Sequence, residues 1–169
     1  MDILFSFVTV DTFWKVLLFV HFLVAAALLA AVTLQVATVV ATAPVGAAAG
    51  GSADGARGAA VEAPSYATLV VVLYLLQALM GAWIYVKYRT YVRIPMEELR
   101  HWWTVGAFEF KEHVVAMGLG LLPAYWQFWR RPRPAQAVIR GVVTVLLAAS
   151  VWYAFAVGHV ASDFRGVGS

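Results

Sequence analysis

The chain has 169 residues, of which 63% are hydrophobic and 12% are charged, and its formal net charge is +3. A soluble domain has about 45–50% apolar and about 25% charged residues, so the composition excludes an ordinary soluble domain and predicts an all-α integral membrane protein. The basic residues are dispersed, so we expect no nucleic-acid partner, and the lack of cysteine excludes disulfides, thiolate metal sites and iron–sulfur clusters.

Four apolar segments are predicted to cross a bilayer as helices. A hydrocarbon core about 30 Å thick needs about 20 apolar helical residues, and the stretch from Val16 to Ala53 contains no charged residue at all. The predicted spans cover residues 13–37, 66–86, 107–129 and 141–160. We therefore expect a single transmembrane domain over residues 1–169, folded as an integral membrane four-helix bundle.

The third predicted span is the most polar. Its uncharged part, from Val114 to Trp129, is about 24 Å long at 1.5 Å per residue, which is shorter than the hydrocarbon core. The span must therefore extend back into the cluster 109–113, which has the sequence Glu-Phe-Lys-Glu-His and would lie at the edge of the hydrocarbon. The preceding segment 95–106, with Trp102 and Trp103, is predicted to be interfacial.

The four spans divide the connections between two ends of the bundle. Both chain termini and the connection 87–100 fall at one end, here called end A. The Ala- and Gly-rich loop 43–63, predicted to be flexible, and the turn 130–134 fall at the opposite end, called end B. End A carries seven Lys and Arg residues and end B carries five, so the positive-inside rule favours a cytoplasmic end A in a bacterial inner membrane.

Three histidines on three different spans are predicted to converge in the half of the bundle near end A. Two imidazoles at matched depth on different helices are the axial ligands that a b-type haem needs. His21 with His113 is the best-matched pair, and His159 is the substitute or second ligand. Basic residues near end A that could pair with the haem propionates are Lys111, Arg89 and Arg93.

The same polar residues leave other functions open. Glu109 and Glu112 beside the histidines could form a site for a non-haem metal ion such as iron, copper, manganese or zinc, although the Glu-x-x-His spacing of di-iron bundles is absent. They could also carry protons or ions. A third alternative is purely structural, with Lys111 paired to a glutamate, in an accessory or anchoring subunit of a larger membrane complex.

The segment from Lys15 to His21, Lys-Val-Leu-Leu-Phe-Val-His followed by small residues, is similar to the first histidine-bearing helix of HemJ-type protoporphyrinogen oxidases and CopD-like membrane domains. The four-span plan resembles that of small bacterial membrane cytochromes b. Residues 24–31 depart from the HemJ pattern because they are Ala- and Leu-rich, without its Trp, Gly and aromatic run. No histidine is predicted near end B, so the resemblance implies at most one bis-histidine haem.

The resemblance and the histidine pattern together predict an oxidoreductase or oxidoreductase subunit. One b-type haem would pass electrons between a membrane quinol, or the cofactor of a partner, and an acceptor at end A. Glu109, Glu112 and Lys111 would handle protons or orient the ligands. The expected partners are the lipid bilayer, a quinone, and other membrane subunits or a second copy of the chain.

Overall fold

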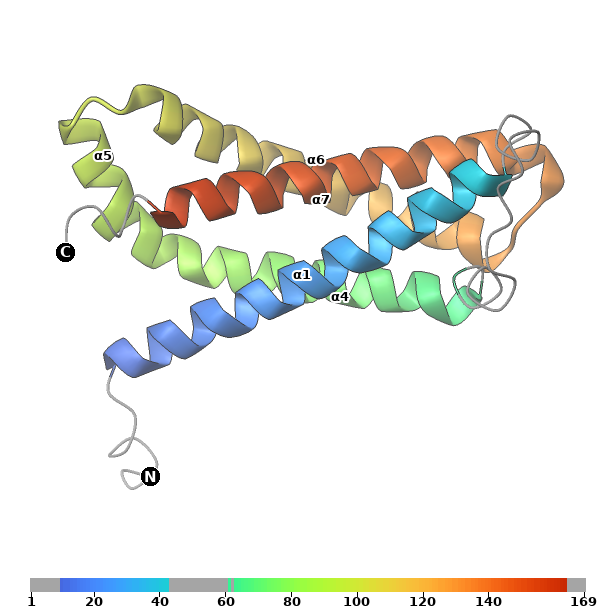
Figure 1. Ribbon diagram of the computed structural model, residues 1–169, viewed down its shortest axis with the longest axis horizontal. Helices are drawn as coiled ribbons and strands as arrows, with labels where there is room; N and C mark the ends of the chain where they lie inside the picture. The colour runs from blue at the N-terminus through green and yellow to red at the C-terminus, as the bar shows by residue number, and fades with distance from the viewer. Residues whose placement is uncertain (1–9, 43–60, 62, 164–169) are drawn as a thin grey trace, which may run out of the picture.

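The computed structural model describes residues 10–42, 61 and 63–163. Over these residues the chain is helical and has no β-strand, as predicted for an all-α protein. Four long helices make up the fold: α1 (Val10–Thr42), α4 (Pro64–Tyr88), α6 (Trp102–Arg130) and α7 (Ala137–Asp163) (Figure 1). Most of the predicted flexible loop 43–63 lies outside the described residues.

Short helical segments connect the long helices. α4 continues through a π-helical turn, η1 (Arg89–Arg93), into the short helix α5 (Ile94–Glu98). The chain then turns a corner at Arg100, which has a φ of 59°, and enters α6. The predicted interfacial segment 95–106 is therefore most of α5, this corner and the first turn of α6. At the other end, η2 (Pro134–Gln136) leads into α7.

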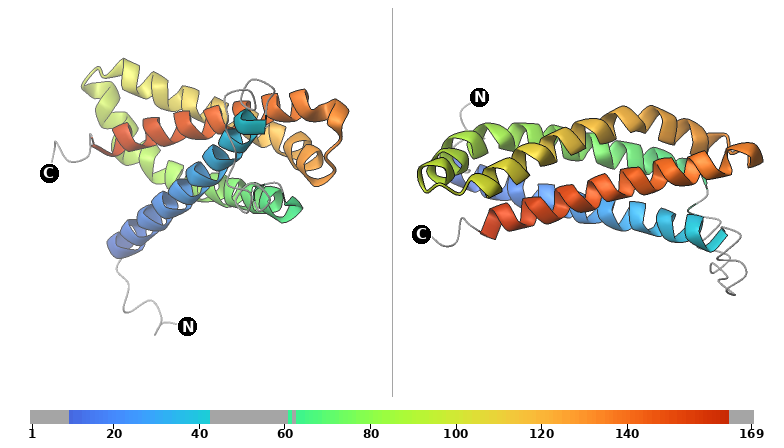
Figure 2. Two further views of the ribbon diagram at one scale, coloured as in Figure 1. Left: turned by 45° about the vertical axis from the view of Figure 1, so that its right-hand side comes forward. Right: turned by 90° about the horizontal axis from the view of Figure 1, so that it is seen from above.

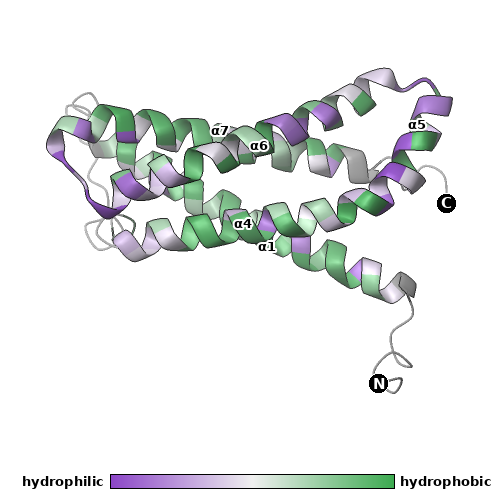
Figure 3. Cartoon of the chain, turned by 180° about the vertical axis from the view of Figure 1, so that it is seen from behind, coloured by the Kyte–Doolittle hydropathy of each residue, from purple (hydrophilic) through white to green (hydrophobic). Residues whose placement is uncertain are grey.

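Each long helix extends beyond the apolar span predicted for it at both ends. Three stretches are long and apolar enough to cross a membrane, namely Thr12–Ala41, Pro64–Glu98 and Pro134–Val160. The predicted third span, 107–129, is helical within α6, but α6 is not among these three. Figure 3 shows hydrophilic residues on α5 and well into the first half of α6, where the cluster 109–113 lies.

The helices are close together at one end of the molecule and spread apart at the other (Figures 1 and 2). α6 packs against α7 and α4, while α1 packs against α4 and α7. The start of α1, the end of α7 and α5 lie at the spread end, which is end A (Figure 1). The turn from α6 to α7 lies at the opposite end, which is end B (Figure 1).

The core is tightest in the half near end B. Apolar side chains from all four helices form one cluster, which includes Val32, Val70, Leu122 and Leu147. Polar side chains are buried among them and hydrogen-bonded across helices. The Tyr125 hydroxyl donates to Oε1 of the fully buried Gln35, and the Trp129 indole donates to Oγ1 of Thr144 at 2.9 Å. These bonds fix how α1, α6 and α7 pack.

Changing Tyr125 to phenylalanine is expected to destabilise the protein by about 1–2 kcal/mol. Oε1 of Gln35 would lose its donor, and Nε2 of Gln35 already has no hydrogen-bond partner among the described residues. Thermal unfolding of the detergent-purified protein, followed by tryptophan fluorescence, measures the change. The double change Tyr125→Phe with Gln35→Leu should restore part of the loss, because it removes both polar groups.

Candidate functional site

The spread half of the bundle near end A contains a cavity of about 650 Å³ lined by all four long helices. Most of its wall is aliphatic or aromatic, with residues such as Leu18, Ala78, Val115 and Val151. A few polar side chains interrupt this wall, and they are His21, Tyr74, Gln77, Tyr85, Tyr88, Lys111, Glu112 and His159. A mostly apolar cavity with a few converging polar groups is typical of a cofactor or small-molecule site.

His21 lies in the cavity wall on α1 and is half-buried. Its Nε2 is 3.0 Å from Nε2 of Gln77 on α4. Nδ1 of His21 and Oε1 of Gln77 are buried and have no hydrogen-bond partner among the described residues. Gly81, one turn after Gln77, also lies beside the ring, and a Cβ there would make an ordinary van der Waals contact of 3.5 Å with Cε1 of His21.

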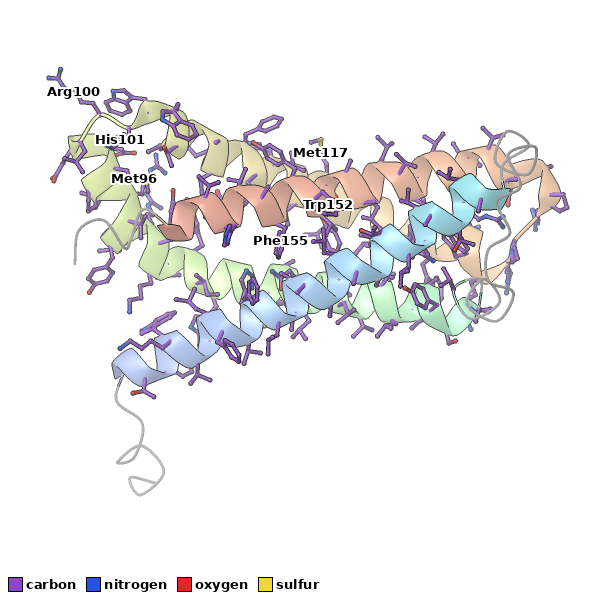
Figure 4. All side chains as sticks on the ribbon, in the orientation of Figure 1. Met96, Arg100, His101, Met117, Trp152 and Phe155 are labelled. Atoms are coloured by element: carbon purple, nitrogen blue, oxygen red, sulfur yellow. The ribbon has the colours of Figure 1, made fainter. Side chains whose placement is uncertain are left out.

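His159 reaches the cavity from α7, near end A. It is exposed, so it lies closer to the surface than His21. Phe155, one turn deeper on α7, also lines the cavity, and its ring centroid is 6.0 Å from that of Phe22 on α1. Figure 4 shows Phe155 between α7 and α1. The structure therefore brings His21 and His159 to one cavity from neighbouring helices.

Lys111 and Glu112 supply the charged part of the wall from α6. The ammonium of Lys111 lies 3.6 Å from the ring centroid of Phe108, which is a cation–π contact. Phe108 stacks on Tyr88 of α4 with 3.7 Å between ring centroids, and Tyr88 in turn stacks on Tyr85. This aromatic stack joins α4 to α6 at the side of the cavity nearest α5.

His113, predicted to be a haem ligand, does not line the cavity. Its side chain is exposed, and Nδ1 lies 2.8 Å from the backbone oxygen of Glu109 in the same helix. The sequence predicted only how deep His113 lies along the helix. Its position around the helix axis turns its side chain away from the cavity. Residues 108, 111, 112, 115, 116 and 119 line the cavity from α6, and residue 113 is not among them.

Arg93 and Glu109 bind each other rather than the cavity. Nη2 of Arg93 lies 2.8 Å from Oε1 of Glu109, and its Nε lies 2.7 Å from Oε1 of Glu97. These ion pairs tie η1 and α5 to α6. Arg89 is exposed and is not part of the cavity wall. Of the three basic residues predicted to pair with haem propionates, Lys111 alone lines the cavity.

The alternative metal site does not form in the part of the chain that the structure describes. No three His, Asp or Glu side chains gather there in a way that could hold a metal ion. Glu109 is engaged by Arg93, while Glu112 lies in the cavity wall and His113 is exposed.

Gln77 and Gly81 also belong to the site, although neither was predicted from the sequence to be a site residue. Gln77 is the polar residue in the middle of an uncharged span, and Gly81 follows it by one helical turn. A polar residue in an uncharged span could have indicated a hydrogen-bonding neighbour on another helix. That neighbour is His21.

The chain matches no protein-family model, no curated protein and no solved structure.

Proposed function

We propose that this is an integral membrane protein that holds one b-type haem in the cavity near end A and transfers electrons through it. The insertion in a bilayer is supported by three helices of sufficient length and apolarity. It is also supported by many large apolar side chains on the outer surface, among them Phe19, Leu79 and Trp83, each more than half exposed. Such surfaces are costly in water and favourable in lipid.

The observation that carries the haem proposal is the pairing of His21 and His159 in one apolar cavity of about 650 Å³. Imidazole is the usual axial ligand of a b-type haem, and apolar walls suit the macrocycle. The proposed ligand pair differs from His21 with His113, which the sequence favoured, because His113 lies outside the cavity.

The surroundings of His21 fit an axial ligand. A histidine on a metal usually donates a hydrogen bond from its other ring nitrogen, which fixes the ring. Histidine binds haem iron through Nε2, the less hindered ring nitrogen, and Nε2 of His21 contacts the Gln77 amide in this structure. Gln77 would therefore give up this contact when haem binds, and the buried Nδ1 would be the nitrogen that donates the second hydrogen bond. Lys111 supplies a positive charge in the cavity wall that could pair with a propionate.

The haem would supply one-electron transfer, and the protein would hold and insulate it. The electron donor we propose is a quinol from the membrane or the cofactor of a partner subunit. Tyr85 and Tyr88, together with Glu112, give the cavity wall hydroxyl and carboxyl groups that could exchange protons with a quinol. An accessory subunit without haem is the second candidate, supported by the same exposed apolar surfaces.

The first experiment is a reduced-minus-oxidised visible spectrum of the full chain, expressed with a haem precursor and purified in mild detergent. We expect sharp b-type bands and about one haem per chain by the pyridine haemochrome assay. Metal analysis of the same sample identifies any other metal. A colourless, folded preparation would contradict the haem proposal, and it would favour the accessory subunit if no metal is bound.

A further inference from the structure

A second, smaller cavity lies at end B, far along the bundle from the first. Its volume is about 280 Å³, and it is lined by Trp129, Pro132, Arg133, Pro134 and Arg140. It forms where α6 ends and the chain turns through η2 into α7. Two guanidinium groups therefore meet an indole and a turn that contains two prolines, which restrict the backbone of the turn.

The positive charge at this cavity is not balanced by nearby acidic residues of the described chain. Four basic residues occur between positions 130 and 140, and no acidic residue occurs between Glu112 and Asp163. The glutamates of α5 and α6 all lie toward end A. In Figure 3 the turn after α6 is accordingly one of the most hydrophilic parts of the fold.

The site is held in place before any ligand binds. The guanidinium of Arg140 lies over the Trp129 ring, with Cζ 5.0 Å from the ring centroid. The Trp129 indole is fixed by its bond to Thr144, and Oγ1 of Thr144 donates to the backbone oxygen of Arg140 at 2.8 Å. Nε of Arg140 is buried and has no hydrogen-bond partner among the described residues. An oriented guanidinium with an unused donor is suited to an oxyanion.

The cavity lies where α6 ends and α7 begins, at one end of the stretch Pro134–Val160 that is long and apolar enough to cross a membrane. Val138 and Val142 are exposed on the opposite face of α7 from Arg140, because they are two residues from it on the helix. A lipid whose headgroup is bound at this end of α7 would extend its hydrocarbon along the apolar stretch. A free anion would make no use of it.

We propose that this cavity binds the phosphodiester headgroup of an anionic phospholipid. Arg140 and Arg133 would bind the phosphate oxygens, and the acyl chains would lie along the apolar stretch of α7. The proposal rests on the membrane insertion proposed above but not on haem. A colourless protein that selects anionic lipid would therefore contradict the haem proposal alone.

Native mass spectrometry of the full chain with phosphatidylglycerol and phosphatidylcholine of matched acyl chains tests the proposal. The wild type should bind phosphatidylglycerol at least about tenfold more tightly than phosphatidylcholine. Arg133→Gln and Arg140→Gln should each weaken phosphatidylglycerol binding about tenfold, because each removes a charge-assisted hydrogen bond. Circular dichroism checks that the variants are folded. If Arg140→Gln does not fold, Arg133→Gln alone tests the proposal, because Arg133 is exposed.

Arg131→Gln is the matched control, because Arg131 is exposed in the same turn but does not line the cavity. It should leave lipid binding within about twofold of the wild type. An equal loss in all three variants would indicate a diffuse basic surface and would overturn the proposal. Equal binding of the two lipids would also overturn it, as would displacement of phosphatidylglycerol by equimolar inorganic phosphate, which would indicate a site for free anions.

Discussion

Replacing His21 with alanine is expected to weaken haem binding by at least about 100-fold, since even residues that only orient a metal ligand contribute about 10–100-fold to metal affinity. The His21 ring lies in the cavity wall, is half-buried and is held by Gln77 at 3.0 Å. Its loss would remove a ligand without removing the apolar pocket. The haem-to-protein ratio of the purified variant, followed by haem titration, measures the effect.

Imidazole added to the His21→Ala variant distinguishes a lost ligand from a misfolded protein. The free base can enter the space left by the side chain and should restore the low-spin haem spectrum. His113→Ala is the matched control, because it removes an exposed imidazole outside the cavity wall, and it should keep its full complement of haem. Full haem retention in His21→Ala, or haem loss in His113→Ala, would contradict the proposed ligand assignment.

The difference between His21 and His113 shows which part of the site can be predicted from one sequence. The distance of a residue from the end of an apolar run predicts its depth in the bundle, and it predicted similar depths for the two histidines. Depth does not give the position around the helix axis, which changes by about 100° per residue. In the structure Phe108, Lys111 and Val115 line the cavity, whereas the side chain of His113 is exposed outside it.

The ion pairs of Arg93 could not be predicted from the sequence, because they depend on the path of the chain between α4 and α6. Arg93 was expected to face a cofactor, but the π-helical turn and α5 bring it to Glu97 and Glu109 instead. A single residue added to one helical turn rotates every later side chain. The apolar runs in the sequence predicted the four long helices but gave no sign of the π-helical turn η1. The path of the chain between α4 and α6 depends on that turn.

The fold therefore has two halves with different packing. Near end B the four helices enclose a dense core, in which buried polar groups such as Gln35 and Tyr125 bind each other. Near end A the helices separate around the large cavity. Tyr74 of α4 lies at the boundary between the halves, because it belongs to the core cluster and also lines the cavity, and its hydroxyl lies against Gly118 of α6.

Changing Gly118 to alanine is expected to destabilise the protein by about 3 kcal/mol through overpacking. A Cβ at this position would collide with the Tyr74 hydroxyl, and it would lie 2.7 Å from Cζ of Tyr74 and 3.0 Å from Oγ of Ser150. Tyr74 is buried, and its hydroxyl donates to the backbone oxygen of Val115 at 3.1 Å. The ring cannot move aside without losing this bond and opening the packing of α4 against α6.

Gly120→Ala is the matched control, because it makes the same change two residues later in the same helix, where a Cβ would meet no atom within 4 Å. Its stability should change by less than about 1 kcal/mol, in the stabilising direction expected from helix propensity. Thermal unfolding in detergent compares the two variants. Adding Tyr74→Phe to Gly118→Ala should recover part of the loss, because it removes the closest of the colliding atoms. Equal stability of the Gly118→Ala and Gly120→Ala variants would show that α4 and α6 do not cross as closely as this packing requires.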